Sequence, residues 1–138
     1  GLPKWDSDDP LLTSKNGRDW RKFLGSAGVF YSSPLDLDFS MLRRLPEAYG
    51  VEDNDLEEPD EDTIMAVLGK SHGDADQYSE DRQQYFTVYH QRFKLGSKPA
   101  AHLGALSELD DDTLRDNAPK SIARLLDAVK KKLDELPE

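Results

Sequence analysis

Apolar positions in the first part of the chain show helical spacing, interrupted by one short continuous run. Residues 16–28 carry apolar side chains at intervals of three and four, which predicts an amphipathic helix. The β-branched and aromatic run over 29–33 predicts a short strand. Residues 34–50 return to helical spacing, with a disturbance at Pro46 and an end at Gly50. A helix that leads into a short buried strand is typical of an α/β layer.

The second half of the chain has helical patterns only. Helices are predicted over residues 62–69, 80–94, 97–109, 110–115 and 119–136, each ending near a glycine or a polar break. In the second of these helices the apolar stripe is aromatic and consists of Tyr85, Phe86, Tyr89 and Phe93. The last helix has the most regular apolar face, formed by Ile122, Leu125, Leu126, Val129, Leu133 and Leu136.

Between these two parts lies a strongly acidic stretch, residues 51–62. Like charges repel one another and resist burial, so we expect an exposed, mobile loop in which nothing is buried. A calcium-binding EF-hand is excluded by its spacing. Counted from Asp53, the sixth position holds Glu58 where glycine is needed, and the twelfth holds Ile64 where glutamate is needed.

The predicted fold class is α+β and mostly helical. Its 138 residues are enough for one compact domain. We divide them into an α/β segment over residues 1–50, an acidic and flexible insertion over 51–78, and a helical domain over 79–138. Because the first residue is Gly1 and not methionine, we expect the chain to be a processed or excised piece of a longer protein.

The composition limits the cellular compartments and the binding partners that can be expected. No apolar run approaches the roughly 20 residues that a membrane helix needs, and no secretory signal is recognised, so a cytoplasmic protein without membrane contacts is expected. The absence of cysteine excludes disulfides and thiolate chemistry. The formal net charge of −10 gives no overall attraction to a phosphate backbone, so nucleic-acid binding would need a local basic patch or bound cations.

Two aspartates in the phrase "SPLDLD", Asp36 and Asp38, admit two interpretations. If Ser33 caps a helix and Pro34 starts it, Asp36 completes a capping box, and the two aspartates point about 200° apart. If the backbone stays extended here, the two carboxylates share one face. They would then repel one another unless a cation such as Mg²⁺ or Mn²⁺ lay between them. Periodicity alone favours the structural interpretation but leaves both open.

Lys98 breaks a local rule. It falls in the first turn of the helix that Ser97 caps, where the helix dipole disfavours a cation. Such exceptions often mark functional sites, although a solvated lysine would lose only a few tenths of a kcal/mol there. His90 and His102 have no metal-binding spacing and are better explained as packing or surface residues. The "GKS" phrase at 69–71 lacks the earlier glycine of a phosphate loop, which excludes ATP binding by this chain.

Several longer phrases occur together in one order: "GVFYSSPLDLDFSML", "PEAYG", "AVLGKSHG", "YHQRFKLGSKPAAHLGAL" and "APKSIARLL". Together they resemble the C-terminal region of the class 2 overcoming-lysogenization-defect (OLD) nucleases, over Leu2 to about Leu136. Such bacterial proteins join an N-terminal ABC-type ATPase to a C-terminal Toprim nuclease domain with an additional helical domain. The resemblance implies that residues 1–50 form the C-terminal part of a Toprim-like domain.

The resemblance also implies an activity, the metal-dependent endonucleolytic cleavage of DNA. Asp36 and Asp38 match acidic ligands of a two-metal Mg²⁺ or Mn²⁺ site, and Lys98 matches an essential catalytic lysine. The other Toprim acidic residues and the ATP-binding domain belong upstream of Leu2. We therefore expect this chain to be inactive alone, with the rest of the Toprim domain, the ATPase domain, DNA and a second copy of itself as partners.

Basic residues and the last helix supply two further hypotheses. The side chains predicted to contact DNA phosphates are Arg43, Arg44, Lys94, Lys120 and Arg124. Each one singly is more simply explained as solvated surface charge. The alternative function is a non-catalytic, acidic helical module for dimerisation or docking, with residues 119–136 as its main surface.

Overall fold

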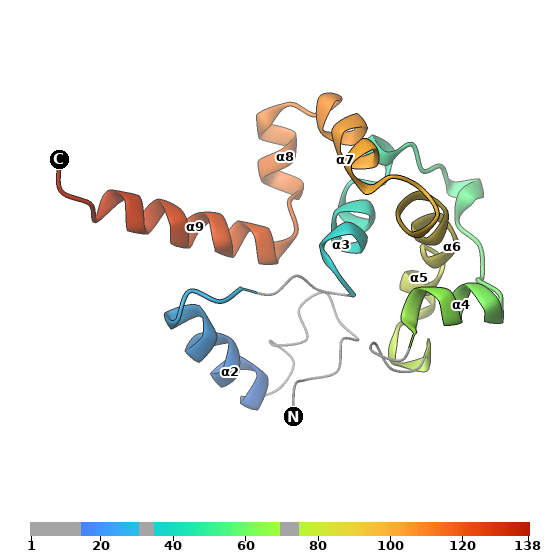
Figure 1. Ribbon diagram of the computed structural model, residues 1–138, viewed down its shortest axis with the longest axis horizontal. Helices are drawn as coiled ribbons and strands as arrows, with labels where there is room; N and C mark the ends of the chain where they lie inside the picture. The colour runs from blue at the N-terminus through green and yellow to red at the C-terminus, as the bar shows by residue number, and fades with distance from the viewer. Residues whose placement is uncertain (1–14, 31–34, 70–74) are drawn as a thin grey trace.

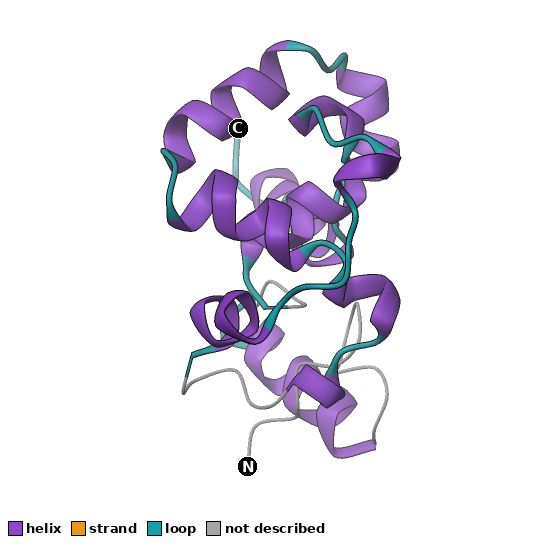
Figure 2. Cartoon of the chain, turned by 90° about the vertical axis from the view of Figure 1, so that its right-hand side faces the viewer, coloured by secondary structure: helices purple, strands orange, loops and turns teal. Residues whose placement is uncertain are grey.

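Helices and loops make up the part of the chain that the structure describes. This computed structural model describes residues 15–30, 35–69 and 75–138. Within these ranges there is no β-strand (Figure 2). The prediction of a mostly helical protein is confirmed, whereas the α/β part of the predicted fold class is not found in these ranges.

The elements fall into three groups along the chain. Those that precede the acidic stretch are α2 (Lys15–Ser26), α3 (Leu37–Arg44) and the 3-10 turn η1 (Glu47–Tyr49). Those of the middle part are η2 (Asp53–Asp55), α4 (Glu61–Leu68), η3 (Ala75–Gln77), α5 (Glu80–Gln83), α6 (Phe86–Tyr89) and the π-helix η4 (His90–Lys94). The last three helices are α7 (Lys98–Ser107), α8 (Asp111–Asn117) and α9 (Lys120–Asp134).

Helix α2 ends at a glycine, as its sequence predicts. Gly28 has a φ of 77°, and the amide of Val29 donates to the carbonyl of Leu24 over 2.9 Å, which is the long bond of a Schellman cap. The strand predicted over 29–33 is not found at Val29 and Phe30, and its other residues lie outside the described ranges. A strand needs a partner for its backbone groups, and none is present among the described residues.

An aromatic cluster holds the middle of the protein together. The ring of Phe39 on α3 meets Phe86 and Tyr89 edge-on, with centroids 5.8 and 5.4 Å apart, and Tyr89 stacks on Phe93. All four rings are buried. Aromatic side chains bury the largest areas of any residue type, so this cluster anchors α3 against α6 and η4. Three of the four residues of the predicted aromatic stripe are thereby placed in the core, and the fourth, Tyr85, is partly buried in a turn.

The single helix predicted over 80–94 is wrong in detail. Residues Gln84 and Tyr85 form a turn between α5 and α6, and the segment ends as a π-helix in which the Leu95 amide reaches back to the His90 carbonyl over 2.9 Å. Close packing follows at Gly96, where an added Cβ would lie 2.5 Å from the Arg92 carbonyl oxygen. Only glycine allows this approach, which redirects the chain into α7.

The acidic stretch is better packed than its charge predicts. Val51 and Pro59 are buried, which corrects the expectation that nothing in residues 51–62 can be buried. The carboxylates remain outside and several act as caps, since Asp55 accepts from the Glu52 amide and Asp60 caps α4. Scattered apolar residues thus attach the stretch to the core while its charges face water.

Helix α9 projects away from this core (Figure 1). A hydrogen bond of 3.2 Å from Arg44 Nε to the carbonyl of Asn117 joins α3 to the end of α8, just before α9 begins. Beyond this point the apolar face of α9 stays largely uncovered, with Leu126 59 % and Leu133 62 % exposed. The helix that the sequence predicts most clearly therefore adds little to the core.

The buried cluster gives a first prediction. Leu42 is fully buried and Leu103 is 72 % exposed, so the same substitution tests the core and the surface. Leu42→Ala should lower the free energy of unfolding by about 2–5 kcal/mol, whereas Leu103→Ala should change it by less than about 0.5 kcal/mol. Urea denaturation followed by circular dichroism measures both. Equal effects of the two substitutions would contradict this core.

Candidate functional site

The start of α3 is set by Asp36 itself. Asp36 has extended backbone angles, and its Oδ1 accepts the amide of Phe39 over 2.9 Å, so it is the N-cap of α3. The predicted capping box, with Ser33 as cap and Asp36 three residues after it, is therefore wrong, and Ser33 lies outside the described residues. The preceding residue, Leu35, has a φ of 58°, a left-handed conformation that is unfavourable for a leucine.

The second carboxylate oxygen of Asp36 points into the core. It accepts a hydrogen bond of 2.5 Å from the hydroxyl of Tyr89, one of the buried aromatic residues. Burial and this carboxylate raise the pKa of Tyr89, which therefore stays protonated and remains a donor. Asp36 thus joins the helix cap to the aromatic cluster.

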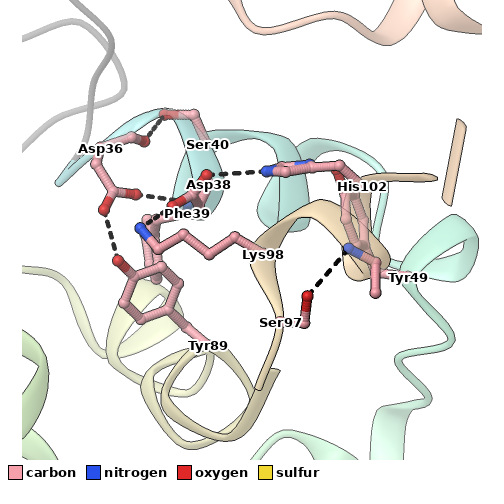
Figure 3. Close-up of polar contacts among 10 residues, drawn as sticks. Asp36, Asp38, Phe39, Ser40, Tyr49, Tyr89, Ser97, Lys98 and His102 are labelled. Carbon is pink, nitrogen blue, oxygen red and sulfur yellow. Dashed lines mark hydrogen bonds and ion pairs between the residues drawn. The ribbon is translucent and has the colours of Figure 1, made fainter. Parts of the chain in front are cut away.

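Asp38 stands two residues further on, inside the first turn of α3, and binds residues of α7. Its Oδ2 accepts a hydrogen bond from the ammonium group of Lys98, at 60 residues' separation in sequence (Figure 3). Lys98 is the first residue of α7, which Ser97 caps as predicted. The cation that the α7 dipole disfavours is thus held by the carboxylate across from it.

A histidine completes the contacts of Asp38. His102 Nε2 lies 2.8 Å from Asp38 Oδ1, and its Nδ1 lies 2.8 Å from the hydroxyl of Tyr49. An ionised carboxylate only accepts, so in the neutral ring Nε2 carries the proton and Nδ1 accepts from Tyr49. Burial and the nearby Asp38 charge raise the pKa of Tyr49 to about 12, which keeps this hydroxyl a donor.

The contact between Asp38 and Lys98 favours the charged form of each residue. Burial alone would raise the pKa of Asp38, but hydrogen bonds from Lys98 and His102 outweigh it and lower that pKa below its usual value. The hydrogen bond to Asp38 raises the pKa of Lys98 in turn. At neutral pH Asp38 is therefore ionised and Lys98 is charged.

Three of these residues, Asp36, Asp38 and Lys98, are candidates that the sequence predicts, and Lys98 meets Asp38 here. His102 packs as predicted, with its ring 5.2 Å from that of Phe93, but it also binds Asp38, which the sequence does not predict. The available signal was its spacing, since Lys98 and His102 are four residues apart and so share one face of a helix.

The two aspartates supply part of what a divalent ion needs. Carboxylate oxygens are the preferred ligands of Mg²⁺ and Mn²⁺. Here each of the four oxygens accepts from a protein donor, and an ion at Asp38 Oδ2 would have to displace Lys98. Among the described residues, no group of three or more carboxylate or imidazole side chains could hold a metal ion. The described residues therefore do not by themselves form a metal site.

The basic residues predicted to contact DNA do not form one cluster around this site. They are spread over α3, η4 and α9, and several have contacts within the protein. Arg43 pairs with Asp81 at 3.4 Å, Arg44 binds the end of α8, and the Lys94 ammonium lies 5.4 Å above the ring of Tyr89. Lys120 is exposed and Arg124 half-buried on α9. Their contact with phosphate remains a prediction.

Comparison with known proteins does not assign a function to this chain. No family model, curated protein or solved structure matches the chain. In the described ranges, no helix is both long enough and apolar enough to cross a membrane. The geometry around Asp38 is therefore the main evidence available for a function.

The lowered pKa of Asp38 gives a pH prediction. A carboxyl group whose pKa is lower in the folded state stabilises the fold above its unfolded pKa, near 3.9, and this contribution is lost as the pH falls. Asp38→Asn should therefore flatten the acid side of the stability curve below about pH 4. Lys98→Met, which removes the main partner, should flatten it as well. Urea denaturation between about pH 2.5 and 7 measures the slope, and unchanged slopes would contradict the pairing.

Proposed function

We propose that this chain is the C-terminal part of a divalent-metal-dependent DNA endonuclease of the class 2 OLD type. The observation that carries the proposal is the contact between Asp38 and Lys98, beside Asp36. These are the three residues that the resemblance assigns to the nuclease site, and Lys98 of α7 meets Asp38 of α3, the helix that Asp36 caps. An ion pair formed by chance at the surface would seldom join residues that the resemblance also names.

In this proposal the residues have distinct roles. Asp36 and Asp38 supply two of the carboxylates that hold Mg²⁺ or Mn²⁺, and those ions, when bound, activate water and stabilise the leaving oxygen of the phosphodiester. Lys98 neutralises charge on the phosphate as the transition state forms. His102, held by Tyr49, fixes the orientation of the Asp38 carboxylate. An ammonium group already placed at a carboxylate needs little rearrangement to meet a phosphate.

The proposal includes what lies outside this chain. The remaining acidic ligands of the Toprim domain and an ABC-type ATPase that binds ATP would belong to a longer bacterial cytoplasmic protein. DNA would reach the site through bound cations and basic residues such as Arg43 and Lys120, because the net charge of −10 opposes it otherwise. The chain alone should therefore cut DNA poorly or not at all.

One observation favours a second candidate function, a helical interaction module without chemistry. The apolar face of α9 is exposed, as it would be in a docking element. In that case the contacts of Asp36 and Asp38 are purely structural, holding α3 against α6 and α7. The two functions differ in what the loss of one carboxylate does.

Substitution of the aspartates separates these functions. In a longer protein with the complete nuclease domain, Asp36→Asn or Asp38→Asn should abolish Mg²⁺- or Mn²⁺-dependent plasmid nicking. Asp60→Asn is the matched control, since Asp60 is also an N-cap, accepting from Thr63 over 2.7 Å. Asparagine caps helices as well as aspartate does, so Asp60→Asn should retain nearly the same melting temperature. Asp36→Asn also loses the oxygen that accepts from Tyr89, so it should melt somewhat lower but remain folded. Full nicking by Asp36→Asn and Asp38→Asn would refute the nuclease role.

Lys98 gives a second test of the mechanism. Lys98→Ala should slow nicking by about 10²–10³-fold, as removal of one electrostatic stabiliser does, and DNA affinity should fall much less. Since His102 still donates to Asp38, unfolding free energy should change by less than about 1 kcal/mol. Lys22→Ala, at an exposed residue of α2, is the control. A Lys98→Ala protein that nicks normally would exclude the catalytic role.

A further inference from the structure

The two partners of Asp38 differ in how firmly the protein holds them (Figure 3). The side chain of Lys98 is 46 % exposed and reaches the carboxylate on a flexible four-carbon stem. The side chain of His102 is 25 % exposed and comes from the next turn of the same helix, α7. An exposed ammonium group on a flexible stem exchanges its partners at little cost, whereas a packed ring does not.

The imidazole of His102 is held by two aromatic residues. Its ring centroid lies 5.2 Å from that of Phe93 and 5.8 Å from that of Tyr49, and both of these rings are buried. The Tyr49 hydroxyl also donates to Nδ1 over 2.8 Å, so both ring nitrogens have a partner. A planar ring that is hydrogen-bonded at both ends is fixed in orientation, and its Nε2 proton is directed at Asp38 Oδ1.

Each partner of Asp38 uses a different carboxylate oxygen. His102 binds Oδ1 at 2.8 Å, and Lys98 binds Oδ2. The Asp38 side chain is only 15 % exposed, so loss of every donor would leave a largely desolvated carboxylate without a partner, which is unfavourable. Because His102 stays on Oδ1, the departure of Lys98 from Oδ2 leaves one donor in place. The ammonium group is therefore free to move while the carboxylate keeps its position.

We propose that Tyr49 and His102 are positioning residues, which hold Asp38 in place while Lys98 exchanges Oδ2 for a phosphate oxygen of the DNA backbone. This inference deepens the proposed nuclease function and rests on it for the identity of the phosphate. In this role neither Tyr49 nor His102 touches the reacting atoms. They act through Asp38, whose carboxylate they keep in one orientation after its other partner has left.

NMR spectroscopy of the chain with ¹⁵N-labelled histidine tests how Asp38 is held. At an alkaline pH, where imidazole rings are neutral, His102 should carry an observable proton on Nε2. This signal should persist in Lys98→Ala and Lys98→Met, because the histidine does not need the ammonium group. It should weaken in Tyr49→Phe, which leaves Nδ1 without its donor. Tyr85→Phe is the matched control at another partly buried tyrosine and should not change it. Absence of the signal from the wild-type chain, or its loss in both Lys98 variants, would overturn the inference.

Nicking kinetics in a longer protein with the complete nuclease domain test the positioning role. His102→Leu should lower kcat by about 10–100-fold with little change in KM, because the residue orients a carboxylate and does not bind DNA. His102→Gln retains an N–H donor in place of Nε2 and should recover most of kcat. Tyr49→Phe should cause a smaller loss than His102→Leu, and Tyr85→Phe should cause none. Melting temperatures of the same samples separate a loss of positioning from a loss of fold.

The outcomes distinguish a failure of this inference from a failure of the proposed function. A wild-type longer protein that does not nick DNA would overturn the nuclease function and this role with it. If the wild-type protein nicks and His102→Leu has the same kcat, the positioning role alone is overturned. The same holds if His102→Gln, at an unchanged melting temperature, is as slow as His102→Leu.

Discussion

A partly buried carboxylate needs donors for both of its oxygens. At Asp38 this requirement determines where α7 lies against α3. Lys98 and His102 meet it from the same face of one helix. For both to reach Asp38, α7 has to begin directly opposite the first turn of α3. The close approach at Gly96 and the cap at Ser97 place that beginning. The geometry of the site therefore depends on where one helix ends and the next starts.

The aromatic cluster connects this polar site to the core. Tyr89 and Tyr49 each have a buried ring and a hydroxyl that donates to the site, one to Asp36 and the other to His102. Phe39 is itself a core residue. It packs against Tyr89, and its amide is the one that Asp36 caps. Packing and polar contacts thus support one another, so the carboxylates are held in place whether or not an ion binds.

The sequence predicted the helices well because their signals are local. Ser97 and Asp110 cap α7 and α8 as capping chemistry predicts, whereas the aromatic stripe predicted for one helix is divided over a turn, α6 and η4. The strand over 29–33 failed at its described residues because a strand depends on a partner that local pattern cannot supply. The prediction that nothing in the acidic stretch is buried was wrong, because it rested on charge density alone. The burial of Val51 and Pro59 depends on neighbours distant in sequence.

The sequence by itself determined the helix caps and apolar stripes, which depend on each residue and its neighbours, and it named Asp36, Asp38 and Lys98 as candidates through the resemblance. It placed the helix cap at Ser33 in one interpretation, and it treated His102 as an isolated ring. Only the tertiary structure decided these two points. Asp36 caps α3, and Asp38 meets Lys98 and His102 across 60 and 64 residues. Contacts over that separation arise from how whole helices pack, which no local spacing encodes.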